Sequence, residues 1–231
     1  MKVDILVFSP HPDDAELGVG GLLIKMKGFG YTTGIIDLTR GEMGSYGTPE
    51  IRKEEAWKAK ELLNLDTREI IDLGDCKIED NYKNRIIISN LIRKYKPRIV
   101  LTPFVEDRHP DHITTGTLVK NSNIYCRLKN LKSDYSPHAP KLFLFYPLQS
   151  CIKPTLVVDI TEVFEKKLDV IKVYRSQFER SNQDISPIGI RDYLFHIESR
   201  NRFYGSLINV KYGEAFIVET SLNIKDPFVL V

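Results

Sequence analysis

Residues 3–18 read VDILVFSPHPDDAELG. The apolar run of residues 3–8, interrupted only by Asp4, predicts a buried β-strand. A turn rich in Pro and Asp follows at once, and residues 15–27 predict a helix that ends at Gly28. The chain therefore begins as a strand, a tight turn and a helix.

The same alternation continues along the chain. Thr48 as N-cap and Pro49 as first helical residue predict the start of the second helix. Helices are predicted over residues 48–64, 82–95, 111–129, 162–174 and 189–204. Strands are predicted over residues 32–39, 68–73, 99–102, 142–146, 156–160 and 215–219. We expect the later part of the chain, from residue 142 onward, to finish the sheet and close the pocket. This alternation predicts an α/β protein with a Rossmann-like three-layer fold, a mostly parallel central sheet flanked by helices.

Two similar motifs follow two of these strands. His11-Pro12-Asp13-Asp14 comes after the first strand, and Arg108-His109-Pro110-Asp111-His112 follows the fourth after a short loop, residues 104–107. A glycine-rich loop, residues 40–47, follows the second strand. Ligands of parallel α/β sheets bind beyond the carboxyl ends of the strands. We therefore expect both motifs and the loop to meet at one edge of the sheet.

The residue types in the two motifs suit a metal ion. In a turn that enters a helix, His11 and Asp14 can converge on one point while Asp13 is rotated away by about 100° and stays free. Imidazole with carboxylate favours Zn²⁺, Fe²⁺, Co²⁺ or Mn²⁺ over Mg²⁺ and Ca²⁺. A further histidine, His112 or His109, would complete a three-ligand site with an open position for water.

Other functions find less support in the sequence. Charges of both signs are interleaved and the net charge is only +2, so we expect no nucleic-acid partner. No apolar run is long enough for a membrane span, and the three cysteines form no zinc or redox motif. The glycines of residues 18–21 fall inside the first helix, which indicates close packing rather than a dinucleotide site. We expect one domain over residues 1–231, located in the cytoplasm, with His138 and His196 in structural or surface roles.

Four blocks of the sequence carry a family resemblance. They read SPHPDDAELG (9–18), TRGEMG (39–44), RKEEA (52–56) and RHPDH (108–112). Together they resemble the PIG-L/LmbE family of metal-dependent N-acetylglucosamine deacetylases, most of all the branch that deacetylates N-acetylglucosaminyl malate in bacillithiol synthesis and related chitooligosaccharide-type deacetylases. Shorter similarities continue to residues 176–178. Ser45 and Tyr46 stand where that branch often has Thr-Arg.

The resemblance implies roles for individual residues. It implies three metal ligands, namely His11, Asp14 and His112. Asp13 matches the general base, and His109, oriented by Asp111, matches the histidine that stabilises the oxyanion and protonates the leaving amine. Arg52 matches a substrate-binding arginine, and Tyr193 a tyrosine near the active site. The implied cofactor is Zn²⁺, or Fe²⁺ or another divalent transition metal, the substrate is a small molecule containing N-acetylglucosamine, and the implied assembly is a homo-oligomer.

Two other functions remain open at this stage. Two histidines with one carboxylate also form the facial triad of non-haem iron oxygenases. A non-catalytic protein that binds sugar or metal could use the same scaffold. The additional Asp13 and the pair His109 and Asp111 favour hydrolysis, because amide hydrolysis needs a base and an acid beside the metal.

Overall fold

The central sheet of the computed structural model has five parallel strands in the order β3-β2-β1-β4-β5. The structure describes residues 1–178, 192–226 and 228. The five strands are β1 (Ile5–Ser9), β2 (Thr33–Asp37), β3 (Thr67–Ile70), β4 (Ile99–Pro103) and β5 (Leu142–Tyr146). The strand order reverses between β2 and β4 on either side of β1, and this is where α/β proteins bind ligands.

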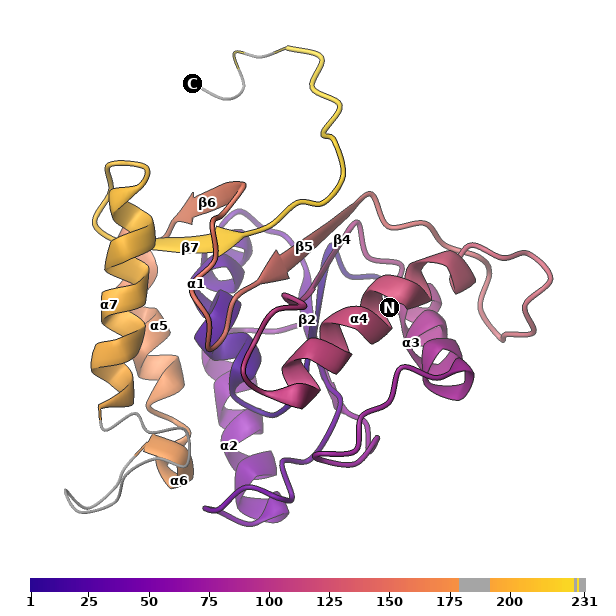
Figure 1. Ribbon diagram of the computed structural model, residues 1–231, viewed down its shortest axis with the longest axis horizontal. Coiled ribbons are helices and arrows are strands. Elements are labelled where there is room, and N and C mark those ends of the chain that lie inside the picture. The colour runs from indigo at the N-terminus through magenta and orange to yellow at the C-terminus, as the bar shows by residue number, and fades with distance from the viewer. Residues whose placement is uncertain (179–191, 227, 229–231) are drawn as a thin grey trace.

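Helices cover both faces of the sheet. They are α1 (Asp14–Gly28), α2 (Pro49–Leu62), α3 (Tyr82–Tyr95), α4 (Pro110–Tyr125), α5 (Phe164–Ile171), α6 (Arg175–Phe178) and α7 (Tyr193–Ser206), with a 3₁₀ turn at Thr161–Val163 before α5. Figure 1 shows α3 and α4 on one side of the sheet and α1, α2 and α5 on the other. The predicted α/β three-layer fold is therefore confirmed.

The apolar run of β1 explains why it lies at the centre. Ile5 and Val7 belong to the core beneath α1 and α2, whereas Leu6 and Phe8 belong to the core beneath α3 and α4. Successive strand residues point to opposite faces, so a strand covered on both sides must be apolar throughout. The same continuous run made this strand recognisable in the sequence.

The last part of the chain departs from expectation. Strands β6 (Leu156–Asp159) and β7 (Gly213–Phe216) pair with each other in a separate antiparallel sheet. A single bridge, between Phe145 and Ile217, connects this pair to β5. β5 thus finishes the central sheet as expected, whereas the expectation that β6 and β7 also join it was wrong, because the pattern of a strand does not identify its partner.

Several helix boundaries differ from prediction, and α5 (Phe164–Ile171), for example, ends three residues before the predicted residue 174. Helix α4 ends at Tyr125 rather than Lys129. The buried Arg93 guanidinium donates hydrogen bonds to the carbonyl oxygens of residues 125, 126 and 128, and these bonds hold the chain in a turn. Helix α7 begins at Tyr193, and residues 189–191 of the predicted helix lie outside the described residues. In the described ranges, every helix is too short or too polar to cross a bilayer.

Candidate active site

The two histidine motifs meet at the carboxyl edge of the sheet. The first occupies the turn between β1 and α1, and the second begins α4. The ring centroids of His11 and His112 are 5.7 Å apart, those of His11 and His109 5.0 Å, and those of His109 and His112 4.7 Å. Residues about a hundred positions apart in the sequence are thus neighbours in space, as the predicted topology requires.

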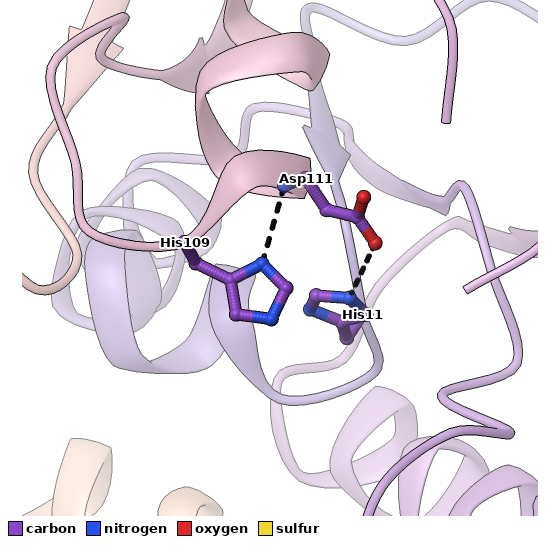
Figure 2. A group of neighbouring side chains, drawn as sticks. All are labelled: His11, His109 and Asp111. Atoms are coloured by element: carbon purple, nitrogen blue, oxygen red, sulfur yellow. Dashed lines mark hydrogen bonds and ion pairs between the residues drawn. The ribbon is translucent and has the colours of Figure 1, made fainter. Parts of the chain in front are cut away.

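One oxygen of the Asp14 carboxylate lies close to two of the imidazoles. Asp14 Oδ2 lies 2.9 Å from His11 Nδ1 and 3.4 Å from His112 Nε2. One ligand atom each from His11, Asp14 and His112 lies within 4.8 Å of the other two, and all three residues are buried. His11, His109 and Asp111 form a second such group (Figure 2).

The ring nitrogens that do not face Asp14 indicate that His11, Asp14 and His112 are the metal ligands. His11 Nε2 lies 3.1 Å from Asp75 Oδ1 and 3.2 Å from Asp111 Oδ2. His112 Nδ1 lies 3.0 Å from Asp107 Oδ1. A carboxylate beside one ring nitrogen holds the proton there and leaves the lone pair on the other nitrogen. The lone pairs of both rings then face Asp14, so these residues fit a single divalent transition metal.

His109 is held in a different way. Its Nδ1 accepts a hydrogen bond from the backbone N–H of Asp111 at 3.2 Å (Figure 2). The proton of the neutral ring is therefore on Nε2, which makes this nitrogen a donor. Burial, together with the neighbouring His112 and His11, lowers the pKa of His109 and favours its neutral form.

The carboxylate of Asp111 does not contact His109. It accepts hydrogen bonds from His11 Nε2 and, at 2.8 Å, from the backbone N–H of Cys76. The pairing of Asp111 with His109 that we expected from the sequence is thus made by the backbone amide, because His109 is the N-cap of α4 and its ring turns back onto the first turn of that helix.

Asp13 pairs with Arg52. Its backbone has φ 120°, a strained value for a residue other than glycine. Arg52 Nη2 lies 3.3 Å from Asp13 Oδ2 and donates at 2.7 Å to the carbonyl oxygen of Pro12. Burial raises the pKa of Asp13 to about 7, although Arg52 opposes this increase. Such a carboxylate can both accept and release a proton near neutral pH.

These side chains line one cavity of about 240 Å³. Met43, Gly44, Ser45 and Tyr46 of the glycine-rich loop form one wall, which places this loop at the site as predicted. Leu17, Gln149, Gln177, Phe178 and Tyr193 also line the cavity. The Tyr193 hydroxyl accepts a hydrogen bond from Gln149 Nε2 at 3.3 Å, and its ring lies 5.1 Å from that of Phe178. Arg52 and Tyr193 are therefore both beside the cavity.

Asp75 and Asp107, the carboxylates behind the two histidines, were not predicted from the sequence. Neither belongs to a motif. Asp75 follows β3 and Asp107 follows β4, so both lie at the edge of the sheet where the motifs meet. The rule that brought the motifs together could have identified both residues.

The sequence also matches known proteins. A family model described as GlcNAc-PI de-N-acetylase (PIG-L) matches residues 6–123, slightly more than half of the chain. The chain belongs to the PIG-L family. The matched region of this PIG-L protein contains every one of the described site residues except Gln149, Gln177, Phe178 and Tyr193.

Relatives extend the similarity over nearly the whole PIG-L chain. The diacetylchitobiose deacetylase of Thermococcus kodakarensis is 29% identical over 91% of this chain and 80% of its own length. A probable N-acetyl-alpha-D-glucosaminyl L-malate deacetylase 2 of Bacillus subtilis is 26% identical over 78% of this chain and 85% of its own. The crystal structure of the conserved protein TT1542 from Thermus thermophilus has a TM-score of 0.87 and 34% identity, covering 96% of this chain and 98% of the other. This PIG-L protein is thus an enzyme of the deacetylase type, a hydrolase of amide bonds.

Proposed function

We propose that the protein removes the acetyl group from a small molecule that contains N-acetylglucosamine. The observation that carries this proposal is the convergence of two imidazoles and a carboxylate, with Asp13 and His109 beside them, on one cavity. The names of the relatives support a substrate with an N-acetylated glucosamine.

His11, Asp14 and His112 would hold the metal ion. Two nitrogens and one oxygen suit Zn²⁺ best, and Fe²⁺ or another divalent transition metal is the alternative. When bound, such an ion supplies Lewis acidity that polarises the acetamide carbonyl and acidifies water.

The protein's own side chains move the protons. Asp13 accepts a proton from the attacking water, and Arg52 keeps its carboxylate ionised and in place. His109 donates its Nε2–H to the oxygen on which negative charge develops. The lowered pKa of His109 favours the neutral ring, which is a poor acid. We therefore assign to Asp13 the step in which a proton is delivered to the leaving nitrogen. The expected role of His109 as the acid therefore changes to that of a hydrogen-bond donor.

The charge of the cavity favours a neutral conjugate. Among the described residues that line it, Arg52 is the one permanent cation, and its guanidinium already meets Asp13 and the carbonyl oxygens of Pro12 and Gly41. Among these described lining residues, no second Arg or Lys is present to pair with the two carboxylates of a malate group. We therefore propose a neutral sugar such as diacetylchitobiose as the better substrate, with N-acetylglucosaminyl malate, the substrate of a bacillithiol pathway, as the second candidate.

Acetate release tests this function directly. Diacetylchitobiose and N-acetylglucosaminyl malate are incubated with the full chain, with and without a chelator, and after zinc is restored. We expect the kcat/KM for acetate release to be higher with diacetylchitobiose than with N-acetylglucosaminyl malate. The activity should be lost with the chelator and recovered with zinc. Absence of acetate from both compounds in the zinc-restored protein would refute the proposal.

Two variants separate the proposed base from the proposed ligands. Asp13→Ala should retain the metal and lose about 10²–10⁴-fold in kcat, the usual contribution of a general base. His112→Ala should lose metal and activity together. Elemental analysis and kcat are measured on both variants. Full turnover of Asp13→Ala, or stoichiometric metal in His112→Ala, would contradict these assignments.

The facial-triad alternative has its own signature. An oxygenase of this ligand type would consume oxygen in the presence of an oxo-acid cosubstrate. We expect no oxygen uptake by the iron-loaded protein, because Asp13 and His109 provide proton transfer and oxyanion binding, which hydrolysis requires. A sugar-binding protein without activity would bind the same sugars but release no acetate.

A further inference from the structure

Cys76 brings a thiol to the exposed edge of the same cavity. It lies in the loop after β3, and its side chain is exposed. Its Sγ lies 3.6 Å from Asp75 Oδ1, and its backbone N–H donates to Asp111 Oδ2 at 2.8 Å. The thiol is thus positioned beside two carboxylates from different parts of the chain.

Three donor atoms converge at this point. One ligand atom each from Asp75, Cys76 and Asp111 lies within 4.8 Å of the other two. The Asp75 and Asp111 side chains are only 5% and 4% exposed. This group has no residue in common with His11, Asp14 and His112, and it therefore forms a separate set of possible ligands.

The two carboxylates of this group share one neighbour. Asp75 Oδ1 and Asp111 Oδ2 both face His11 Nε2, at 3.1 and 3.2 Å. Two buried carboxylates beside each other favour a nearby cation.

We propose that Asp75, Cys76 and Asp111 form a second cation site, selective for thiophilic divalent ions such as Zn²⁺ and Cd²⁺, whose occupation inhibits the enzyme. A thiolate with two carboxylates suits these ions, whereas Mg²⁺ and Ca²⁺ require oxygen ligands throughout. Binding forms a metal–sulfur bond and releases the thiol proton to solvent. The ion would draw the Asp111 carboxylate from His11 and occupy the edge of the cavity beside Met43 and Gly44.

Cadmium titration tests the binding. The full chain, stripped of metal by a chelator, is titrated with Cd²⁺ alone while the ultraviolet thiolate-to-cadmium charge-transfer band and the number of bound ions are measured. The test variant is Cys76→Gly, because glycine adopts the observed φ of 59° without strain and preserves the loop. The control is Cys151→Ser, which removes an exposed thiol outside the cavity lining.

The wild-type protein and Cys151→Ser should bind two ions and show the band. Cys76→Gly should bind one ion without the band. A wild-type titration without the band, or a band of full intensity in Cys76→Gly, would overturn the proposal. This part of the test does not depend on the deacetylase reaction.

Zinc inhibition tests the consequence. For each protein we compare acetate release with zinc in excess against release with one equivalent. At a zinc concentration ten times the dissociation constant of the second site, mass action predicts about a tenfold decrease in wild type. The ratio should stay near one in Cys76→Gly. Equal inhibition of both proteins would refute inhibition through this site, even if cadmium binding through Cys76 is observed.

Discussion

Arg52 places a fixed positive charge beside the carboxylate that we propose as the base. Asp13 is buried, and burial alone would keep this carboxyl protonated at neutral pH. The guanidinium at 3.3 Å opposes this effect. The pair therefore sets the pH at which Asp13 becomes able to accept a proton.

Replacing Arg52 by methionine should shift the pH profile in a defined direction. Below its pKa, Asp13 is protonated and cannot act as a base, so activity decreases as the pH falls. Without Arg52 the pKa of Asp13 rises, and the acid limb of the kcat/KM profile should move to higher pH. Arg52→Lys, which retains the charge, should shift the limb less. Neither variant changes His11, Asp14 or His112, so both should bind metal as the wild type does. An unchanged acid limb in Arg52→Met would contradict the role of the pair.

Asp107 organises the second motif through three contacts. It accepts from the His112 ring at 3.0 Å, from the backbone N–H of His109 at 2.9 Å and from that of Gln149 at 2.8 Å. The side chain is buried, at 3% exposure. It therefore controls the orientation of a proposed metal ligand without reaching the metal itself.

Asp107→Asn should weaken metal binding by about 10–100-fold, the usual effect of losing a carboxylate partner of a metal-bound histidine. The dissociation constant is measured by competition with a chromophoric chelator. The exposed Asp134, which is not among the residues that line the cavity, provides the matched control, since Asp134→Asn removes the same charge. Equal affinities for the two variants would show that Asp107 does not position His112.

Helix α1 depends on a close approach at Gly18. A Cβ at this position would overlap the ring of Tyr146, which is fully buried and donates from its hydroxyl to the carbonyl oxygen of Phe8 at 2.9 Å. The ring cannot move away without breaking this bond. The interpretation of the glycines in residues 18–21 as packing residues is confirmed at Gly18 and at Gly21, where a Cβ would lie 2.9 Å from Ile160, but not at Gly20, where it would make an ordinary contact. The same helix begins with Asp14.

Gly18→Ala should destabilise the protein by about 1–3 kcal/mol through overpacking. Gly28 is the control, because it ends the same helix and a Cβ there would have no neighbour within 4 Å. Gly28→Ala should change stability by less than about 1 kcal/mol, and in the favourable direction. Urea unfolding measures both free energies. A Gly18→Ala variant as stable as Gly28→Ala would contradict the close packing.

The elements that could be predicted from sequence are those whose cause is local. The apolar run of β1 and the Thr48-Pro49 start of α2 are signals within a few residues, and both elements lie where they were expected. The pairing of β6 with β7 and the end of α4 at Tyr125 depend on contacts with distant residues, such as Arg93. At the site, the motif residues could be named in advance, whereas Asp75 and Asp107 act through contacts that only the folded chain creates.

At the scale of the whole molecule, Arg68 connects four parts of the core. Its guanidinium meets Asp37 Oδ2 at 2.7 Å, Glu16 Oε1 at 2.5 Å and the carbonyl oxygen of Ala56 at 3.0 Å. The Tyr174 hydroxyl donates to the same Glu16 oxygen at 2.8 Å. One buried cation thus joins β3, β2, α1 and α2 just below the turn that carries Asp13 and Asp14.

Arg68→Met should destabilise the protein by about 3–5 kcal/mol, because it leaves two buried carboxylates without a cation. Burial already raises the pKa of Asp37 to about 6 although Arg68 opposes the increase, so without Arg68 this pKa rises further. The folded variant then binds more protons than the unfolded one, and the loss should be smaller at pH 5 than at pH 8. Arg85→Met, which breaks the more exposed pair with Asp80, should cost at most about 1 kcal/mol. Urea unfolding of both variants at the two pH values is the measurement. A loss in Arg68→Met that does not change with pH would indicate that Arg68 contributes packing rather than charge.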